Sequence, residues 1–445
     1  MHNLAITLRK RGFVVTGSDD EIFEPSRSRL AAYGLLPEKP GWDPGKITPD
    51  IDYIILGMHA AKDNPELLKA LETGVKIYSF PEFLYEQTKN KKRIVIAGSH
   101  GKTTTTAMIM HVFRHLGMKF DYMAGSSVDG FESPIELSDE SDISVFEGDE
   151  YPASAVDRQP KFLLYRPDIA IINGIAWDHM NVYPTFEEYT ELFRLFTGTI
   201  TEGGTLIYFE DDSEVKKIAL ETADSIRKIP YRVHGYFQNK TGFYAATICR
   251  VVPVKFFGEH NMQNLSAARE ACMAAGVGED DFYEAIRSFS GTSRRLQKLS
   301  ENENGIVFLD FAHSPSKVKA TVDAVVSRYP GKNVIACLEL HTFSSLNIRF
   351  LPYYHGTLES AAFKYVYFNP QVVQSKNLAP LTREMVKEAF GGGNIEVFDD
   401  SEEMFSHVKN LNKVNPVYLF MSSGDFDGYD FQSFSTELLS DKRVP

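Results

Sequence analysis

The sequence predicts an α/β protein of three domains: a truncated Rossmann-like N-terminal domain, a central P-loop ATPase domain and a C-terminal doubly wound α/β domain. At 445 residues, the chain is too long for one ordinary core. Short apolar runs typical of buried parallel strands alternate with helical patterns. The third observation is a strand, a glycine turn and a helix start within residues 93–106. We place the domains at residues 1–91, 92–295 and 296–445.

The composition is that of an ordinary globular protein, with 43% hydrophobic and 24% charged residues and a net charge of −13. This negative field argues against nucleic-acid binding. The three cysteines, Cys249, Cys272 and Cys337, lack metal-type spacing and fit a reducing compartment. The sequence shows neither an apolar run of about 18–20 residues nor a signal peptide, so we expect a cytoplasmic protein without membrane insertion. The oligomeric state is not predicted.

The N-terminal segment predicts half of a βαβ unit. Residues 1–10 indicate a helix, followed by a strand at 13–16 and a turn at 17–20. We expect the opening strand and glycine loop of such a unit upstream, and the 445 residues do not include them. The α/β alternation continues with a strand at 53–56, a helix at 65–73, a strand at 76–78 and a basic linker at 89–93.

The central motif is a phosphate cradle that follows a buried strand at 94–97. The helix that begins near Lys102 has an apolar stripe and ends before Gly117, which suits a C-cap. Backbone N–H groups and the helix dipole would face an anion, Lys102 would reach the β/γ-phosphates, and Thr103 could ligate Mg²⁺. The spacing G-x-x-G-K-T is short, with Ile96 at the position of the first glycine. A glycine-rich turn with a solvated lysine is the alternative. The flanking strand and helix favour an ATP site made of Gly98, Ser99, His100, Gly101, Lys102, Thr103 and Thr104.

Two further strands of this domain end in polar residues. The strand at 143–146 leads to Glu147-Gly-Asp-Glu150, and the strand at 169–172 leads to Trp177-Asp178-His179. In open α/β sheets, ligands gather beyond the carboxyl ends of the strands. Glu150 and His179 are therefore candidate Mg²⁺ ligands or partners of such ligands. Each alone would more often be a satisfied turn residue, but their shared position beside a phosphate loop favours the metal role.

A helix that opens at Gly258 and ends near Gly276 carries a candidate adenine site. Asn261 and Asn264 lie one turn apart, and amides suit an adenine edge on which His260 could stack. The alternative is ordinary N-capping by an asparagine. Further along, Arg294 and Arg295 either form a solvated basic turn or clamp a transferring phosphoryl group.

The C-terminal part repeats the alternation of strands and helices. Its first strand ends at Asp310 and His313, which could hold ribose hydroxyls and approach the phosphates, respectively. The run 422–428 is either a substrate turn or a plain tight turn. Strands are expected near 307–311, 334–338, 365–368, 395–398 and 417–421.

Taken together, these motifs resemble the Mur ligase family, ATP-dependent amide-forming enzymes of cell-wall synthesis. The resemblance covers nearly the whole chain. It is carried by Gly98-Ser-His-Gly-Lys-Thr-Thr-Thr, Glu147-Gly-Asp-Glu, Asn173 through Asp178-His179, His260-Asn261-x-x-Asn264, Gly291-Thr-Ser-Arg-Arg and Asp310-Phe-Ala-His313-Ser-Pro.

The resemblance implies ATP and Mg²⁺ as cofactors and an acyl-phosphate mechanism. It implies that the first domain binds UDP-N-acetylmuramate and that the last binds a peptide or amino acid. The resemblance implies that the catalytic residues are Lys102, Glu150, His179 and Arg295, and that the metal ligands are Thr103, Glu150 and His179. It also implies that adenine contacts His260, Asn261 and Asn264, that ribose contacts Asp310, and that the γ-phosphate contacts Arg295.

Two segments resemble one branch of the family. Residues 161–167 and 421–426 look most like the member that joins the tripeptide L-alanyl-γ-D-glutamyl-meso-diaminopimelate to UDP-N-acetylmuramate, whereas a sister member uses L-alanine. Residues 186–196 lack the lysine found in branches that act later, which favours a muramate substrate. Arg349 is a candidate for a peptide carboxylate, and Trp177 departs from the family pattern.

Two rival functions stay open. A non-catalytic nucleotide-binding protein would follow if the first strand and glycine loop were truly missing. A P-loop kinase is less favoured, because it needs neither the Arg294-Arg295 pair nor a third α/β domain.

Overall fold

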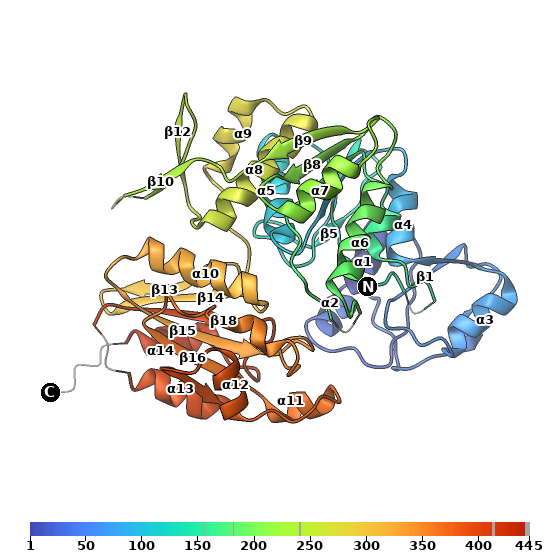
Figure 1. Ribbon diagram of the computed structural model, residues 1–445. Coiled ribbons are helices and arrows are strands. Elements are labelled where there is room, and N and C mark those ends of the chain that lie inside the picture. Colours follow the sequence, from blue (N-terminus) through green and yellow to red (C-terminus); the bar gives the residue numbers. More distant parts are fainter. Residues whose placement is uncertain (155, 181, 240–241, 412–413, 441–445) are drawn as a thin grey trace. The chain divides into compact units, whose positions relative to one another are not determined.

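The computed structural model describes residues 1–154, 156–180, 182–239, 242–411 and 414–440. By its contacts, the chain divides into two compact units (Figure 1). The first comprises Met1–Ile175, Thr190–Arg232 and Ser266–Ile286, and the second comprises Ala176–Tyr189, Val233–Leu265 and Arg287–Pro445. The predicted domain boundaries after residues 91 and 295 remain predictions.

A seven-stranded sheet forms the centre of the first unit, in the order β5-β4-β6-β3-β7-β8-β9. Every neighbouring pair runs parallel except β4 and β5. The central strand β3 is buried along all but its first residue, as its apolar run predicts. The strands are β3 (Lys92–Ala97), β4 (Asp121–Met123), β5 (Ile135–Glu136), β6 (Ile143–Glu147), β7 (Ile169–Ile172), β8 (Thr205–Phe209) and β9 (Arg227–Tyr231). The predicted strands at 94–97, 143–146 and 169–172 are confirmed.

Helices of the predicted kinds accompany this sheet. Gly117 follows the helix α5 with φ +68°, the left-handed conformation expected of a residue just past a helix end. The helix predicted from Gly258 to about Gly276 is confirmed as α8. The helices are α5 (Lys102–His115), α6 (Phe186–Thr197), α7 (Ser213–Glu221), α8 (Glu259–Ala274), α9 (Glu279–Ile286) and the short 3₁₀ helix η2 (Lys161–Leu164).

The N-terminal segment contains a two-stranded parallel sheet, β1-β2. The predicted helix at 1–10, strand at 53–56 and helix at 65–73 are confirmed. The predicted strand at 13–16 is wrong: these residues pair with no described strand, and Val14 is 91% exposed. An extended segment without a neighbouring strand lacks the ladder hydrogen bonds that define one. The elements are α1 (His2–Lys10), α2 (Ser26–Ala32), η1 (Pro44–Lys46), β1 (Tyr53–Leu56), α3 (Pro65–Thr73), β2 (Lys76–Ser79) and α4 (Phe80–Thr88).

The basic segment predicted as a linker at 89–93 is a turn after α4 that leads into the first two residues of β3. Arg93 belongs to β3 and is 4% exposed. One of its guanidinium nitrogens (Nη1) donates to the carbonyls of Thr88, Lys89 and Lys91, and its Nε donates to the carbonyl of Arg166. These carbonyls include the C-terminal end of α4, which has no further helical donors. Arg93 therefore fastens α4 to the sheet.

A six-stranded sheet, β13-β14-β18-β15-β16-β17, forms the centre of the second unit. Only the pair β13-β14 is antiparallel. All five C-terminal strands predicted from the sequence are confirmed. The strands are β13 (Gln297–Asn302), β14 (Gly305–Asp310), β15 (Asn333–Leu340), β16 (Phe363–Phe368), β17 (Ile395–Phe398) and β18 (Pro416–Met421).

Both faces of this sheet are covered. Alternate residues of β14 enter two different apolar clusters, which α10 and α12 complete on one face and α13 and α14 on the other. The doubly wound α/β architecture is thus confirmed. The helices are α10 (Pro315–Arg328), η3 (Leu351–Tyr354), α11 (Pro370–Ser375), α12 (Arg383–Ala389), α13 (Ser401–Lys409) and α14 (Phe431–Leu438).

The second unit also includes a small antiparallel sheet that the sequence did not predict. It consists of β10 (Tyr236–Gln238), β11 (Phe243–Ala246) and β12 (Val251–Val254). Across the described part of the chain, no helix is both long and apolar enough to cross a membrane.

The contacts of Arg93 generate a stability prediction. Replacement of Arg93 by Met leaves several buried carbonyl oxygens without donors, and we expect the free energy of unfolding to fall by about 3 kcal/mol. Urea unfolding followed by circular dichroism measures this change. Lys92→Met on the same strand is the matched control, because Lys92 is exposed, and its effect should stay within about 0.5 kcal/mol. Equal effects of the two substitutions would contradict the fastening role of Arg93.

Candidate active site

The turn after β3 depends on Gly98. Its φ is +122°, and a Cβ atom added there would lie 2.9 Å from the backbone nitrogen of Asn173 and 3.1 Å from the carbonyl oxygen of Gly174. The Ser99 N–H donates to that same carbonyl at 2.9 Å. A side chain at Gly98 would therefore push the turn away from the end of β7. Gly101, at φ +70°, then opens the helix α5.

Lys102 and Glu150 form a buried ion pair at this turn. The Lys102 ammonium donates to Glu150 Oε2 at 2.7 Å and to the Gly98 carbonyl at 2.7 Å. The two side chains are only 15% and 1% exposed. Burial is the largest single influence and lowers the pKa of Lys102. The carboxylates of Glu150, Asp149 and Glu147 together raise the pKa by more, so the net shift is upward and the ammonium stays charged.

A second carboxylate, which the sequence did not single out as a site residue, lies beside Thr103. The Thr103 hydroxyl donates to Glu147 Oε1 at 2.9 Å, and the Gly125 N–H donates to Glu147 Oε2 at 2.7 Å. A Cβ at Gly125 would lie 2.8 Å from Glu147 Oε1, so a larger residue there would require the Glu147 carboxylate to shift. Glu147 is the last residue of β6, next to the central strand. Its position at the carboxyl end of a strand is the sequence feature that could have identified Glu147 as a site residue.

These groups fit Mg²⁺-ATP. The N-terminus of α5 offers backbone N–H groups and a positive dipole to phosphates, and Lys102 adds a full charge. A threonine hydroxyl with carboxylates from the neighbouring strand is a donor set that suits Mg²⁺. No cluster of three or more His, Cys, Asp or Glu side chains is arranged for a metal ion in the residues that the structure describes. The remaining donors would come from the nucleotide and water.

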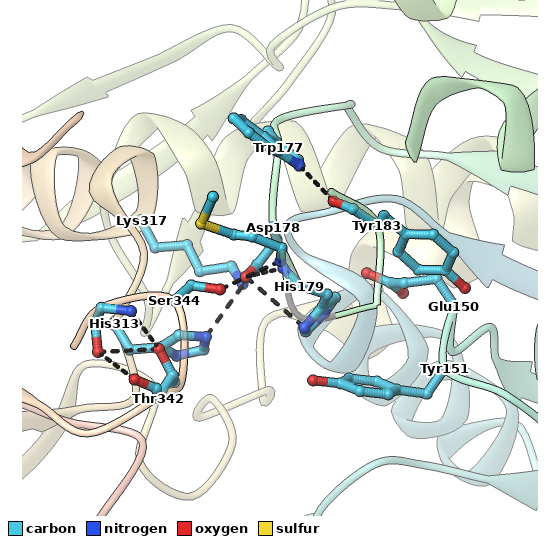
Figure 2. Close-up of polar contacts among 12 residues, drawn as sticks. Glu150, Tyr151, Trp177, Asp178, His179, Tyr183, His313, Lys317, Thr342 and Ser344 are labelled. Atoms are coloured by element: carbon cyan, nitrogen blue, oxygen red, sulfur yellow. Dashed lines mark hydrogen bonds and ion pairs between the residues drawn. The ribbon is translucent and has the colours of Figure 1, made fainter. Parts of the chain in front are cut away.

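The Asp178-His179 turn lies in the second unit (Figure 2). Asp178 Oδ1 accepts the His179 N–H at 2.8 Å, while Asp178 Oδ2 lies 3.1 Å from the Lys317 ammonium and 4.0 Å from His313 Nε2. His179 adopts φ +56°. Burial is the largest single influence and raises the pKa of Asp178. The Lys317 ammonium, the two nearby histidines and the His179 N–H together outweigh burial, so the pKa ends far below its usual range. Burial, aided by Lys317, lowers the pKa of His313 to about 3, so that imidazole is neutral.

The unusual Trp177 has a packing explanation. Its ring lies edge-on to Phe350 and Tyr353, at centroid distances of 6.1 and 5.9 Å, and its indole N–H donates to the Tyr183 carbonyl at 3.0 Å. The Met180 N–H donates to the Ser344 hydroxyl at 3.3 Å. Figure 2 shows Trp177 and Ser344 near the Asp178 turn. These contacts place the turn in the second unit, whereas Glu150 belongs to the first. Joint Mg²⁺ ligation by Glu150 and His179 stays a prediction.

The predicted adenine residues lie together at the start of α8. The Asn261 amide donates to the Phe257 carbonyl at 2.8 Å, and Asn264 donates to Asn261 Oδ1 at 3.4 Å. His260 is largely buried, and its Nδ1 has no hydrogen-bond partner among the described residues. Asn261 lies inside α8, and its amide donates to a carbonyl where an N-cap would accept a helix N–H, so these contacts do not give it the N-capping role that was the alternative. The orphaned Nδ1 leaves a polar atom for a ligand.

The arginine pair takes two different positions. The Arg295 guanidinium lies 4.5 Å from the centroid of the Phe311 ring, and Arg294 donates to the Ser422 carbonyl at 3.3 Å. Asp310 accepts the N–H groups of Leu296 at 2.6 Å and Ala312 at 2.7 Å. Its carboxylate therefore braces the chain, and the ribose role stays a prediction.

The run at 422–428 is held by a buried carboxylate that the sequence did not indicate. Glu339, 2% exposed at the end of β15, accepts from the Ser422 hydroxyl and, at 3.0 Å, from the Phe426 N–H. Phe426 and Asp427 both have positive φ values, +51° and +63°. Asp427 is held separately, since its Oδ1 accepts from the Asn369 amide at 2.8 Å. The choice between a substrate turn and a plain tight turn stays a prediction. Arg349 is exposed.

Comparison with known proteins identifies the family. Residues 96–272 match the Mur ligase middle domain, and residues 294–424 match the Mur ligase glutamate ligase domain. Together the two matches span well over half of the chain.

Two curated relatives have different acceptor substrates in their names. UDP-N-acetylmuramate–L-alanine ligase of Lactiplantibacillus plantarum is 27% identical, covering 97% of this chain and 94% of its own. UDP-N-acetylmuramate–L-alanyl-γ-D-glutamyl-meso-2,6-diaminoheptandioate ligase of Escherichia coli is 29% identical, covering 76% of each chain.

Two solved structures share the fold. Murein peptide ligase from Psychrobacter arcticus has a TM-score of 0.66 at 22% identity and covers 100% of this chain and 97% of its own. UDP-N-acetylmuramate–alanine ligase from Thermotoga maritima has a TM-score of 0.68 at 20% identity, covering 96% and 94%. With the two domain matches and the ATP-site geometry, these findings show that the chain belongs to the Mur ligase family of ATP-dependent ligases of peptidoglycan synthesis.

Proposed function

We propose that this enzyme joins the tripeptide L-alanyl-γ-D-glutamyl-meso-diaminopimelate to UDP-N-acetylmuramate, the reaction of murein peptide ligase, in the cytoplasmic recycling of peptidoglycan. The observation that carries the proposal is the buried Lys102–Glu150 pair at the glycine turn. Two segments, 161–167 and 421–426, support the tripeptide branch by resemblance. The absence of lysine from 186–196 supports a muramate substrate.

In this proposal the first unit binds the triphosphate. Lys102 turns from Glu150 to the β/γ-phosphates, since an anion replaces the carboxylate as its partner. Thr103 would hold one Mg²⁺, with Glu147, which accepts its hydroxyl, as a further candidate donor. Glu150 and His179 would hold the second. Bound Mg²⁺ would neutralise phosphate charge.

The chemistry needs positioning and charge neutralisation more than acid–base groups. The muramate carboxylate attacks the γ-phosphorus of ATP, ADP leaves, and an acyl phosphate forms. The amine of the peptide then attacks the acyl carbon, inorganic phosphate leaves, and the amine loses a proton. We assign Arg295 to the γ-phosphoryl oxygens, with Phe311 supporting its guanidinium plane.

The remaining nucleotide contacts are assigned by resemblance. His260, Asn261 and Asn264 would hold adenine, for which the orphaned His260 Nδ1 is the supporting observation. Asp310 would use its remaining acceptor capacity for the ribose. His313 would lie near the phosphates as a neutral imidazole.

L-Alanine is the second candidate acceptor. The L-alanine ligase relative aligns over 97% of this chain, compared with 76% for the tripeptide ligase relative. Identities of 27% and 29% do not separate the two.

The acceptor choice generates a direct test. With ATP, Mg²⁺ and UDP-N-acetylmuramate present, we expect phosphate release to depend on the tripeptide and to exceed the rate with L-alanine by at least about 100-fold. A discrimination of that size follows if the acceptor site pairs the additional charged groups of the tripeptide. Product mass identifies the amide formed. Efficient turnover with L-alanine alone would replace our assignment by the second candidate.

The phosphate role of Lys102 generates a second test. Lys102→Ala should lower ligation by about 100- to 1,000-fold, because it removes a preorganised charge from the transferring phosphoryl group. Steady-state phosphate release measures this loss. Lys119→Ala is the matched control, since Lys119 is exposed and pairs with exposed Glu140; its activity should be unchanged.

Lys102→Ala also removes the ammonium that pairs with the buried Glu150 carboxylate, so stability is measured as well. Lys102→Ala/Glu150→Gln removes the buried negative charge too and should recover thermal stability but not activity. Normal turnover by Lys102→Ala would refute the phosphate assignment.

A further inference from the structure

We propose that Lys317 is a positioning residue for His179: its ammonium, paired with the Asp178 carboxylate, holds the turn that presents the His179 imidazole. The inference rests on the proposed function, in which His179 is a metal ligand. It assigns to Lys317, a residue of α10 that is distant from His179 in the sequence, the role of orienting a metal ligand.

The His179 turn is strained and needs support. Its φ of +56° is uncommon for a residue with a side chain, and such conformations persist where the surroundings fix them. The His179 carbonyl accepts the N–H groups of Val182 and Tyr183 at 2.8 and 3.0 Å, which holds the backbone that follows. On its other side, the His179 N–H donates to Asp178 Oδ1 at 2.8 Å. The His179 Nδ1 lies 3.8 Å from the same oxygen. The orientation of His179 therefore depends on where the Asp178 carboxylate points.

The position of the Asp178 carboxylate depends in turn on Lys317. Its second oxygen, Oδ2, lies 3.1 Å from the Lys317 ammonium, and the Asp178 side chain is only 7% exposed. A buried carboxylate needs a compensating charge. The His313 imidazole, at 4.0 Å from Oδ2, is beyond hydrogen-bond distance. The Lys317 ammonium, within hydrogen-bond distance of Oδ2, supplies the compensation.

The contacts on either side of Asp178 leave this role to Lys317. Trp177 packs against Phe350 and Tyr353, and the Met180 N–H bonds to Ser344. These contacts hold the backbone of the turn, but none of them touches the carboxylate. Loss of Lys317 should therefore leave the turn attached while it frees Asp178 to rotate.

The same helix provides a matched control. Lys319 pairs with Asp323 at 2.6 Å, with both side chains about half exposed at 58% and 41%. Both lysines are on α10 and both have a carboxylate partner, but only Lys317 reaches the His179 turn. An exposed pair contributes little to stability.

The test uses metal-free enzyme with ¹³Cε1-labelled histidine, whose His179 signal is assigned by its loss in His179→Gln. We expect Lys317→Met to shift or broaden the His179 signal. Lys319→Met should leave it in place, and Lys317→Arg should restore it. In the ligation assay, the Mg²⁺ concentration for half-maximal rate should rise about 10-fold in Lys317→Met, as for other residues that orient a metal ligand.

The outcomes distinguish a failure of the Lys317 inference from a failure of the proposed metal role of His179. If His179→Gln keeps wild-type activity and Mg²⁺ dependence, the metal role of His179 fails, and the inference fails with it. If His179→Gln is impaired but Lys317→Met matches Lys319→Met in both readouts, only the positioning role is overturned. If Lys317→Met does not fold, the milder Lys317→Gln is used, and the same comparison decides.

Discussion

The ion pair between Lys102 and Glu150 is the constraint around which the first unit is organised. Two charges that are 15% and 1% exposed can stay buried only as partners, so the β3 turn and the loop after β6 must meet. They do meet, because β3 and β6 are parallel neighbours whose carboxyl ends share one edge of the sheet. β7, on the other side of β3, closes on the turn through the near-contact at Gly98.

Much of the fold and of the phosphate loop could be predicted, because their signals are local. An apolar run, two glycines and Lys102-Thr103 lie within a few residues of one another, and the strand that feeds them is uniformly buried. Contacts between segments that are distant in the sequence cannot be predicted from such local patterns. Glu147 accepts from Thr103 through one oxygen and from the Gly125 N–H, after β4, through the other. The strand expected at 13–16 failed for the same reason, since pairing requires a neighbour that no local pattern supplies.

One of the segments used to choose the branch has a structural role. Phe162 is fully buried and stacks on Phe196 with centroids 4.8 Å apart, and Tyr165 packs on Phe146 at 5.2 Å. Lys161 pairs with Asp149 at 2.6 Å, beside Glu150. Buried rings cannot contact a peptide, so Phe162 and Tyr165 serve the packing of this segment.

At residue 176 the chain passes from one compact unit to the other, although the neighbouring sequence belongs to the first. Ile175 follows β7 and belongs to the first unit, whereas Ala176–Tyr189 belongs by its contacts to the second. Three nearby groups explain this: the Trp177 ring, the Asp178 carboxylate and the Met180 N–H. Each contacts a residue more than 130 positions further along the chain. A boundary drawn at one residue number cannot express this arrangement. The turn that carries His179 is held by contacts with C-terminal residues, although in the sequence it follows β7, a strand of the sheet that carries the phosphate loop.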